Sequence, residues 1–172
     1  ALLLALCLAA CLPSALAEEY AEPNTEDEWV DMGGEWWLVD KEVTYTLPFR
    51  SNKGIYLNRN ASLTAPSIDV EGKVETSGNS RIDCAGLLSA TGKVTVNGYG
   101  ITVGSLECGE IYVGSRLIVK TRFSCTGKVE VNGMLVLPGN TTEEEVRKLN
   151  TTGDGRILVG TKTYDTEGNL LE

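Results

Sequence analysis

Three tryptophans lie close together near the start of the chain, at Trp29, Trp36 and Trp37. Flat indole rings stack well on other rings, including those of sugars. Successive side chains of a strand point to opposite faces, so either Trp36 or Trp37 is expected to face solvent and to be able to bind a ligand. The same aromatic residues also suit a hydrophobic cap over the first turn of a repeat, which is the favoured interpretation, and ligand binding stays open as the alternative.

Acidic side chains are the next candidates for chemistry, because the chain contains no histidine. The absence of histidine excludes Ser-His-Asp and Cys-His catalysis and histidine-ligated metal sites. Paired carboxylates could still cleave a polysaccharide. The acids of the repeat region are scattered, which favours a solvated outer surface, no catalytic residue and no metal or cofactor; they are Asp69, Asp83, Glu107, Glu110 and Glu130.

Three cysteines lie outside the apolar start of the chain. Cys108 and Cys125 occupy equivalent places in neighbouring repeats. Stacked strands would bring them within reach of a disulfide, although an inward-facing ladder of free thiols is the favoured alternative. Cys84 falls in line with Val103 and Val119 and is expected to be a core residue.

The chain has 172 residues, a formal net charge of −9 and a pI near 4.6. An acidic protein lacks the basic footprint that phosphate backbones require, so nucleic acid is not an expected partner. No stretch is apolar enough over sufficient length to predict a transmembrane helix.

Residues 1–17 are typical of a secretory signal peptide, with an apolar run followed by Ala15-Leu16-Ala17. Two alternatives remain, a lipoprotein whose lipid is carried by Cys11 in Leu8-Ala9-Ala10-Cys11, and a buried N-terminal helix. Residues 18–28 are acidic and contain proline, which predicts a solvated linker.

A repeat runs through the rest of the chain. Six apolar residues mark one frame at nearly even intervals, except that the last interval is longer; they are Ile55, Val74, Val94, Ile111, Val129 and Ile157. Without an insertion of about ten residues in the last interval, the period is about 18, within the range of solenoids.

Six-residue units lie inside this period, beginning at Ile111, Leu117, Phe123, Val129 and Leu135. Each has apolar residues at its first and third positions, which is typical of a short strand with one buried face. Three units would form one turn of a parallel β-solenoid whose stacked turns share one aliphatic core. The rival is an antiparallel β-sandwich, because the Asn-Gly pairs at Asn97 and Asn132 also suit hairpins.

The predicted organisation follows from these boundaries. Residues 29–54 form an aromatic N-terminal cap, 55–139 the solenoid, 140–150 a helical insertion and 151–172 a C-terminal strand or cap. Thr142 with Glu145 fits a capping box at the start of the inserted helix. Arg116, Lys120 and Arg122 form a small basic strip, expected to balance neighbouring acids.

The units "GKVTVNG" and "GKVEVNGMLV" resemble those of bactofilins and related bacterial right-handed β-solenoids, over about residues 70–137. The resemblance implies three faces and turns of the same length as the period found here. The expected signal peptide differs from the cytoplasmic location of bactofilins. Units of this kind after such a signal are also similar to repeat segments of bacterial cell-surface proteins.

These observations lead to three functional hypotheses. The first is an exported, non-catalytic scaffold or adhesion module of a bacterial surface or envelope, which binds a glycan or protein partner or associates with itself. The second is a carbohydrate-binding module that uses Trp36 or Trp37. The third is a polysaccharide lyase or hydrolase on the same fold.

Overall fold

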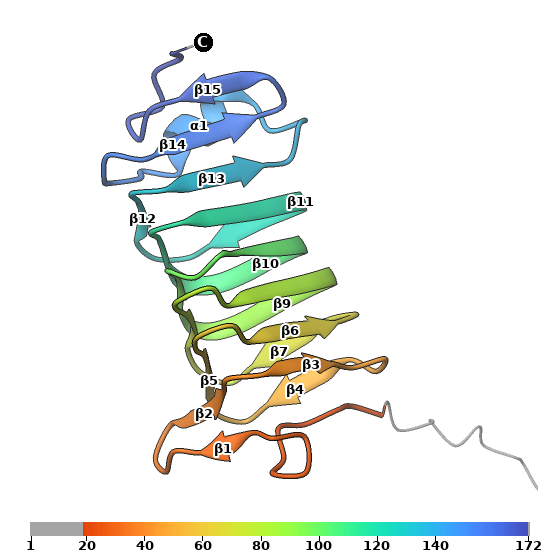
Figure 1. Ribbon diagram of the computed structural model, residues 1–172. Coiled ribbons are helices and arrows are strands. Elements are labelled where there is room, and N and C mark those ends of the chain that lie inside the picture. Colours follow the sequence, from red (N-terminus) through yellow and green to blue (C-terminus); the bar gives the residue numbers. More distant parts are fainter. Residues whose placement is uncertain (1–18, 172) are drawn as a thin grey trace, which may run out of the picture.

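The computed structural model describes residues 19–171 and shows a parallel β-solenoid of about seven turns, each of about 19 residues (Figure 1). The expected signal peptide and Cys11 lie outside the described residues. Each turn, or coil, passes through three short strands, and strands of successive coils pair in parallel. The predicted solenoid is therefore confirmed, and the antiparallel sandwich is excluded for this part of the chain.

The strands stack into three flat faces. Face 1 holds β2 (Trp36–Val39), β5 (Gly54–Leu57), β8 (Val74–Thr76), the last parts of β9 (Arg81–Val96) and β10 (Gly100–Val113), and β12 (Val129–Val131). Face 2 holds β3 (Glu42–Thr44), β6 (Ser62–Ala65), the first parts of β9, β10 and β11 (Arg116–Cys125), β13 (Met134–Leu137) and β14 (Arg156–Val159). Face 3 holds β4 (Phe49–Ser51), β7 (Ile68–Val70), the middle of β9 and β10, and the end of β11.

One apolar side chain stacks on another through the whole interior. Ile55, Val74, Val94, Ile111 and Val129 are register partners on face 1, and each is at most 2% exposed. The periodic frame is thus correct for these five residues. It is wrong for Ile157, which pairs with Leu135 on face 2. After the inserted segment, the chain returns to face 1 at Thr152, which forms an isolated parallel β-bridge with Glu130. The strand that follows therefore lies on face 2.

The sequence Gly-Lys-Val occurs at residues 72–74, 92–94 and 127–129, because each of these corners has room only for glycine. A Cβ atom on Gly72, Gly92 or Gly127 would lie 2.6–2.8 Å from a backbone atom of the coil beneath it. These glycines form a column at the corner that leads into face 1, where adjacent coils approach too closely for a side chain. The Asn-Gly pairs are also corners, between faces 1 and 2: the backbone N–H of Asn97 donates to the Thr76 carbonyl of the preceding coil.

The N-terminal boundary differs from the prediction. Strands β2, β3 and β4 pair in parallel with β5, β6 and β7, so residues 36–51 form the first coil and are more than a cap. The predicted linker also contributes structure. The N–H of Ala21 donates to the Pro48 carbonyl at 2.8 Å, and the N–H of Arg50 donates to the Ala21 carbonyl at 2.8 Å. This pairing covers the outer edge of β4.

Both ends of the rod carry antiparallel strands. β1 (Val30–Asp31) pairs with β2, and β15 (Lys162–Tyr164) pairs with β14. Trp29 covers the first coil: its ring stacks on Phe49 at 5.4 Å between centroids, and its Nε1 donates to the Tyr45 hydroxyl at 2.9 Å. At the other end Tyr164 is 2% exposed over the last coil. An antiparallel strand cannot continue the parallel stack, so these strands mark its limits.

The predicted helix is present as α1 (Glu143–Lys148). Its capping box is confirmed, with the Thr142 hydroxyl accepting from the Glu145 N–H and the Glu145 carboxylate accepting from the Thr142 N–H. Val146 is 2% exposed and packs on the core. α1 occupies the place that a strand of face 3 would take in the last coil.

Candidate functional site

The two adjacent tryptophans have different surroundings. In β2, Trp37 pairs with Ile55 and packs against the buried core, as alternation with the buried Val39 requires. Trp36 pairs with Gly54 and lies on the outer side of face 1. Trp36 is half-buried, because its ring rests against the next coil, where a Cβ on Gly54 would lie 3.0 Å from its Cε3. Of the two predicted ligand-binding residues, Trp36 is therefore the one placed to contact a ligand.

Two shallow hollows meet at the Trp36 ring. One has a volume of about 330 Å³ and is floored by the bare backbone of Gly54, Gly72 and Gly92, with Glu71 and Lys73 at its rim. The other has a volume of about 270 Å³ and is lined by Met32, Trp36, Tyr56 and Glu75. Met32 is 59% exposed, so an apolar rim stands beside the ring. We call this surface the Trp36 shelf.

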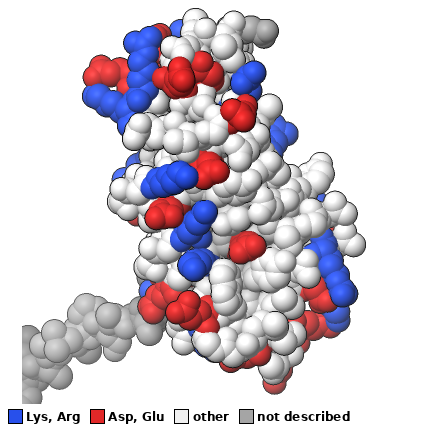
Figure 2. All heavy atoms as spheres, turned by 90° about the vertical axis from the view of Figure 1, so that its left-hand side faces the viewer, with Lys and Arg blue, Asp and Glu red and all other residues white. Residues whose placement is uncertain are grey.

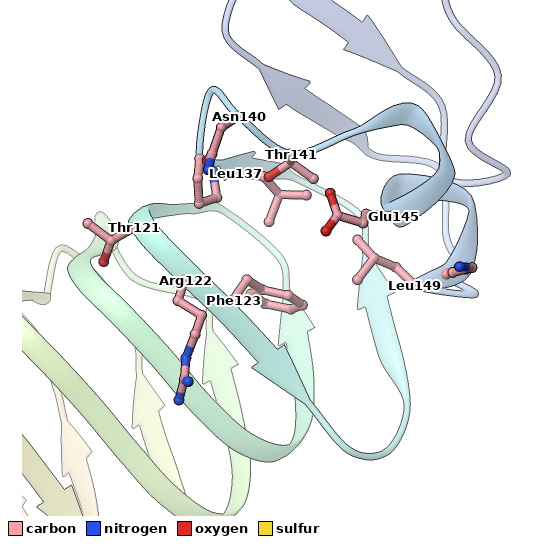
Figure 3. Close-up of a pocket in the computed structure, with 10 residues that line it drawn as sticks. Thr121, Arg122, Phe123, Leu137, Asn140, Thr141, Glu145 and Leu149 are labelled. Atoms are coloured by element: carbon pink, nitrogen blue, oxygen red, sulfur yellow. The ribbon is translucent and has the colours of Figure 1, made fainter.

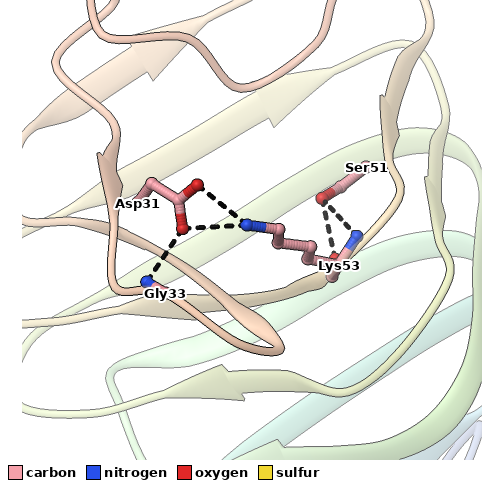
Figure 4. A network of polar contacts seen from close by, with 4 residues as sticks. All are labelled: Asp31, Gly33, Ser51 and Lys53. Atoms are coloured by element: carbon pink, nitrogen blue, oxygen red, sulfur yellow. Dashed lines mark hydrogen bonds and ion pairs between the residues drawn. The ribbon is translucent and has the colours of Figure 1, made fainter.

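A polar network ties the loop before β2 to the next coil, beside the shelf (Figure 4). The Lys53 ammonium donates to both carboxylate oxygens of Asp31, at 2.9 and 2.8 Å, and the Gly33 N–H donates to one of them at 2.9 Å. The hydrogen bond from Lys53, followed by that from Gly33, lowers the pKa of Asp31. Lys53 also lies 5.3 Å from the centroid of the Trp37 ring. The lysine is therefore held in place by Asp31 of β1 and by Trp37 of the preceding coil.

The chemistry of the Trp36 shelf suits a ring with an apolar face and a polar edge. The indole and Met32 offer apolar contact, while Glu71, Glu75 and Lys73 offer charged acceptors and donors around it. Sequence analysis identified Trp36 but missed Met32 and Tyr56. Tyr56 follows Ile55 directly in the periodic frame, so strand alternation already placed it on the outside.

The cysteines lie where the repeat predicted. Cys108 and Cys125 are register partners on face 3, and Cys84 pairs with Val103 on face 2. The structure shows each of the three with an unbonded sulfur. Burial, and then the neighbouring Cys125, raises the pKa of Cys108, which keeps this thiol protonated and unreactive. The disulfide between Cys108 and Cys125 stays a prediction.

The candidate carboxylates do not converge. Asp69 pairs with Arg50 at 3.4 Å on face 3, and Asp83 pairs with Arg81 at 3.6 Å on face 2. On face 1, Glu130 pairs with Lys128 at 2.7 Å, and this hydrogen bond lowers the pKa of Glu130. Positive and negative side chains are interspersed along the rod (Figure 2), as expected for a solvated surface. Within residues 19–171, no group of three Cys, Asp or Glu side chains could hold a metal ion.

A third hollow lies between β11 and α1 and was not predicted (Figure 3). Its volume is about 320 Å³, and Phe123, Leu137 and Leu149 supply its apolar lining. It exists because the end of β11 pairs with β10 on one side while α1 stands in place of the next strand on the other. Figure 3 shows Phe123, Glu145 and Leu149 turned toward this space, and Arg122 turned away. The carboxylate of Glu145, which lines this hollow, already accepts a hydrogen bond from the Thr142 N–H in the capping box.

In the described part of the chain, no helix is long and apolar enough to cross a bilayer. Comparison of the chain with known protein families, with curated proteins and with solved structures finds no match.

Proposed function

We propose that this protein is an exported, non-catalytic β-solenoid scaffold that serves adhesion or envelope structure at a bacterial cell surface. The observation that carries the proposal is the stack of about seven parallel coils, bounded by antiparallel strands at both ends. Such a stack is a stiff rod with three flat outer faces, and it holds groups on those faces at fixed spacings of about 4.8 Å per coil.

The use of surface charge supports a scaffold over an enzyme. Arg81 contacts Glu42 and Asp83, and Arg122 contacts Glu107 of the preceding coil. Each of these acids stands beside a cation and is at least partly open to solvent, whereas a general acid in a glycosidase needs a raised pKa and a partner carboxylate across the scissile bond.

Export and the absence of catalysis can be tested together. The chain, expressed with its N-terminal segment and recovered from the culture medium or the envelope, is expected to begin at Glu18 by mass spectrometry. A lipid-modified chain that begins at Cys11 would show instead that the protein is a lipoprotein anchored to the membrane. Incubation with acidic polysaccharides is expected to leave every chain uncut, and any cleavage would reject the non-catalytic role.

The Trp36 shelf favours carbohydrate binding as a second candidate function. A glycan array probed with the purified protein is the direct test. Trp36→Ala should abolish binding, because it removes the ring on which a sugar would stack, while Trp36→Tyr should retain part of it. Trp37→Ala is the matched control: it removes an equal ring from the inner side of the same strand. If Trp36→Ala binds glycans as the wild type does, the Trp36 shelf is not the glycan-binding site.

A further inference from the structure

The outer side of face 2 changes character along the rod. The position between two inward-facing residues of each face 2 strand points outward, and in four coils it is polar: Thr44, Thr64, Asp83 and Thr102. In the last three coils the same position holds Ile118, Val136 and Leu158, which are register partners. The solvated face of a sheet is normally polar, so three stacked aliphatic residues need an explanation.

Cations that pair with no carboxylate of residues 19–171 flank these aliphatic residues. Arg116 and Arg156 precede Ile118 and Leu158 by two residues, and both are exposed. Met134 lies between them in register and is 39% exposed. Lys120 follows Ile118 by two residues on the opposite flank. We call these seven residues the basic-aliphatic patch.

The cations of this patch differ from the other arginines of the molecule. The five other arginines of residues 19–171 each contact a carboxylate; they are Arg50, Arg59, Arg81, Arg122 and Arg147. Arg116, Arg156 and Lys120 make no such ion pair within that part of the chain. Of the predicted basic strip, Arg122 contacts Glu107, whereas Arg116 and Lys120 contact no carboxylate of the described residues. In a chain of net charge −9, these three cations flank one aliphatic stripe, and Asp83 shares a hollow with Lys120.

From this patch we infer a docking surface for an acidic amphipathic helix of a partner protein. The coils of a solenoid repeat about every 4.8 Å and the turns of a helix about every 5.4 Å, so a helix along the rod would place one aliphatic side chain on each coil. The flanking cations, two residues from the stripe on either side, are about 13 Å apart, which is close to the diameter of a helix. Carboxylates on both edges of the helix would then meet Arg116 and Arg156 on one side and Lys120 on the other.

The aliphatic character of the stripe decides between a protein and an anionic glycan. A glycan would be recognised by aromatic and hydrogen-bonding groups, whereas Ile118, Val136 and Leu158 offer neither. This inference deepens the proposed scaffold function by naming a partner class for one face, and it rests on that function.

The test uses two synthetic amphipathic helices with the same leucine stripe, one flanked by glutamates and the other by lysines. The purified protein is expected to bind the acidic peptide at least about tenfold more tightly, and added salt should weaken that binding. R116E/R156E should weaken it about tenfold or more. I118T/V136T/L158T, which gives the last coils the polarity of Thr102, should weaken it similarly while the circular dichroism spectrum stays unchanged.

The control is K93E/K128E, which makes the same change in net charge at the start of face 1 and should leave the affinity unaltered. Equal affinity for the two peptides, or an unchanged affinity in R116E/R156E, would overturn the inference. So would a homo-oligomer that dissociates in I118T/V136T/L158T, because a second copy would then be the occupant. None of these results would alter the export or the rod shape on which the scaffold function is judged.

Discussion

At the scale of single residues, the glycines of the repeat owe their place to close contact between coils. A Cβ on Gly92 would lie 2.8 Å from the Gly72 carbonyl oxygen, which is backbone and cannot turn away. Gly139 is a matched control, since nothing lies within 4 Å of the place where its Cβ would stand.

We therefore expect Gly92→Ala to lower the free energy of unfolding by about 1–3 kcal/mol through overpacking. Gly139→Ala should change it by less than about 0.5 kcal/mol. Urea titrations followed by circular dichroism give both values. Equal stability of the two variants would mean that the coils separate easily at this corner.

The stacked cysteines give a second prediction at this scale. Cys108 is 6% exposed, and burial raises the pKa of its thiol, whereas Cys125 is half-buried. Iodoacetamide should therefore modify Cys125 first, because the thiolate is the reacting form and needs access. Peptide mass spectrometry over time measures both rates. If neither residue reacts until a reductant is added, the two form the predicted disulfide.

At the scale of elements, α1 is a short helix that depends on its cap. The Thr142 N–H and hydroxyl donate to the Glu145 carboxylate at 2.7 and 2.9 Å. The backbone hydrogen bond from Thr142, and then the side-chain one, lowers the pKa of Glu145 below its ordinary value of 4.5. A carboxyl group with a lowered pKa stabilises the folded form above its unfolded pKa, and this stabilisation disappears as the pH falls through the folded pKa.

Amide hydrogen exchange of α1 should therefore speed up, relative to that of the β-coils, as the pH is lowered from about 5 to 3. Glu145→Gln should lose this pH dependence, since its side chain does not titrate. Glu144→Gln, which alters an exposed ion pair with Lys148, should retain it. An identical pH profile for Glu145→Gln and the wild type would show that the capping box does not hold the helix.

At the scale of the whole molecule, the two antiparallel strands limit the rod. β15 covers the edge of β14, and Tyr164 covers the core beneath it. An uncovered strand edge presents unpaired N–H and C=O groups to other chains.

A chain that ends at Gly160 should therefore associate as its concentration rises, which light scattering after size-exclusion chromatography would measure. Tyr164→Ala separates edge protection from packing, because it removes the buried ring but retains the strand. This variant should be less stable than the wild type and equally monodisperse. If Tyr164→Ala associates while the chain that ends at Gly160 does not, the Tyr164 side chain, and not strand β15, prevents association.

Much of the solenoid could be predicted because its period is local. Apolar residues at the first and third positions of each six-residue unit fix which side chains face inward, and Leu117, Phe123 and Val129 lie on successive faces as the units predict. The capping box was recognisable for the same reason, since Thr142 and Glu145 interact within one turn. Trp36 and Tyr56 on the outer side of face 1 also follow from strand alternation alone.

The sequence by itself thus determined the coil, its inward and outward positions and the inserted helix. Only the tertiary structure decided that the coils begin at Trp36, that Ile157 stacks on Leu135, and that α1 replaces a strand of face 3. It also decided that, among the residues it describes, Arg116 and Arg156 contact no carboxylate while the other arginines do. The physical reason is that a repeat defines neighbours by period, whereas insertions, ends and ion pairs depend on which distant segments come to lie on one face.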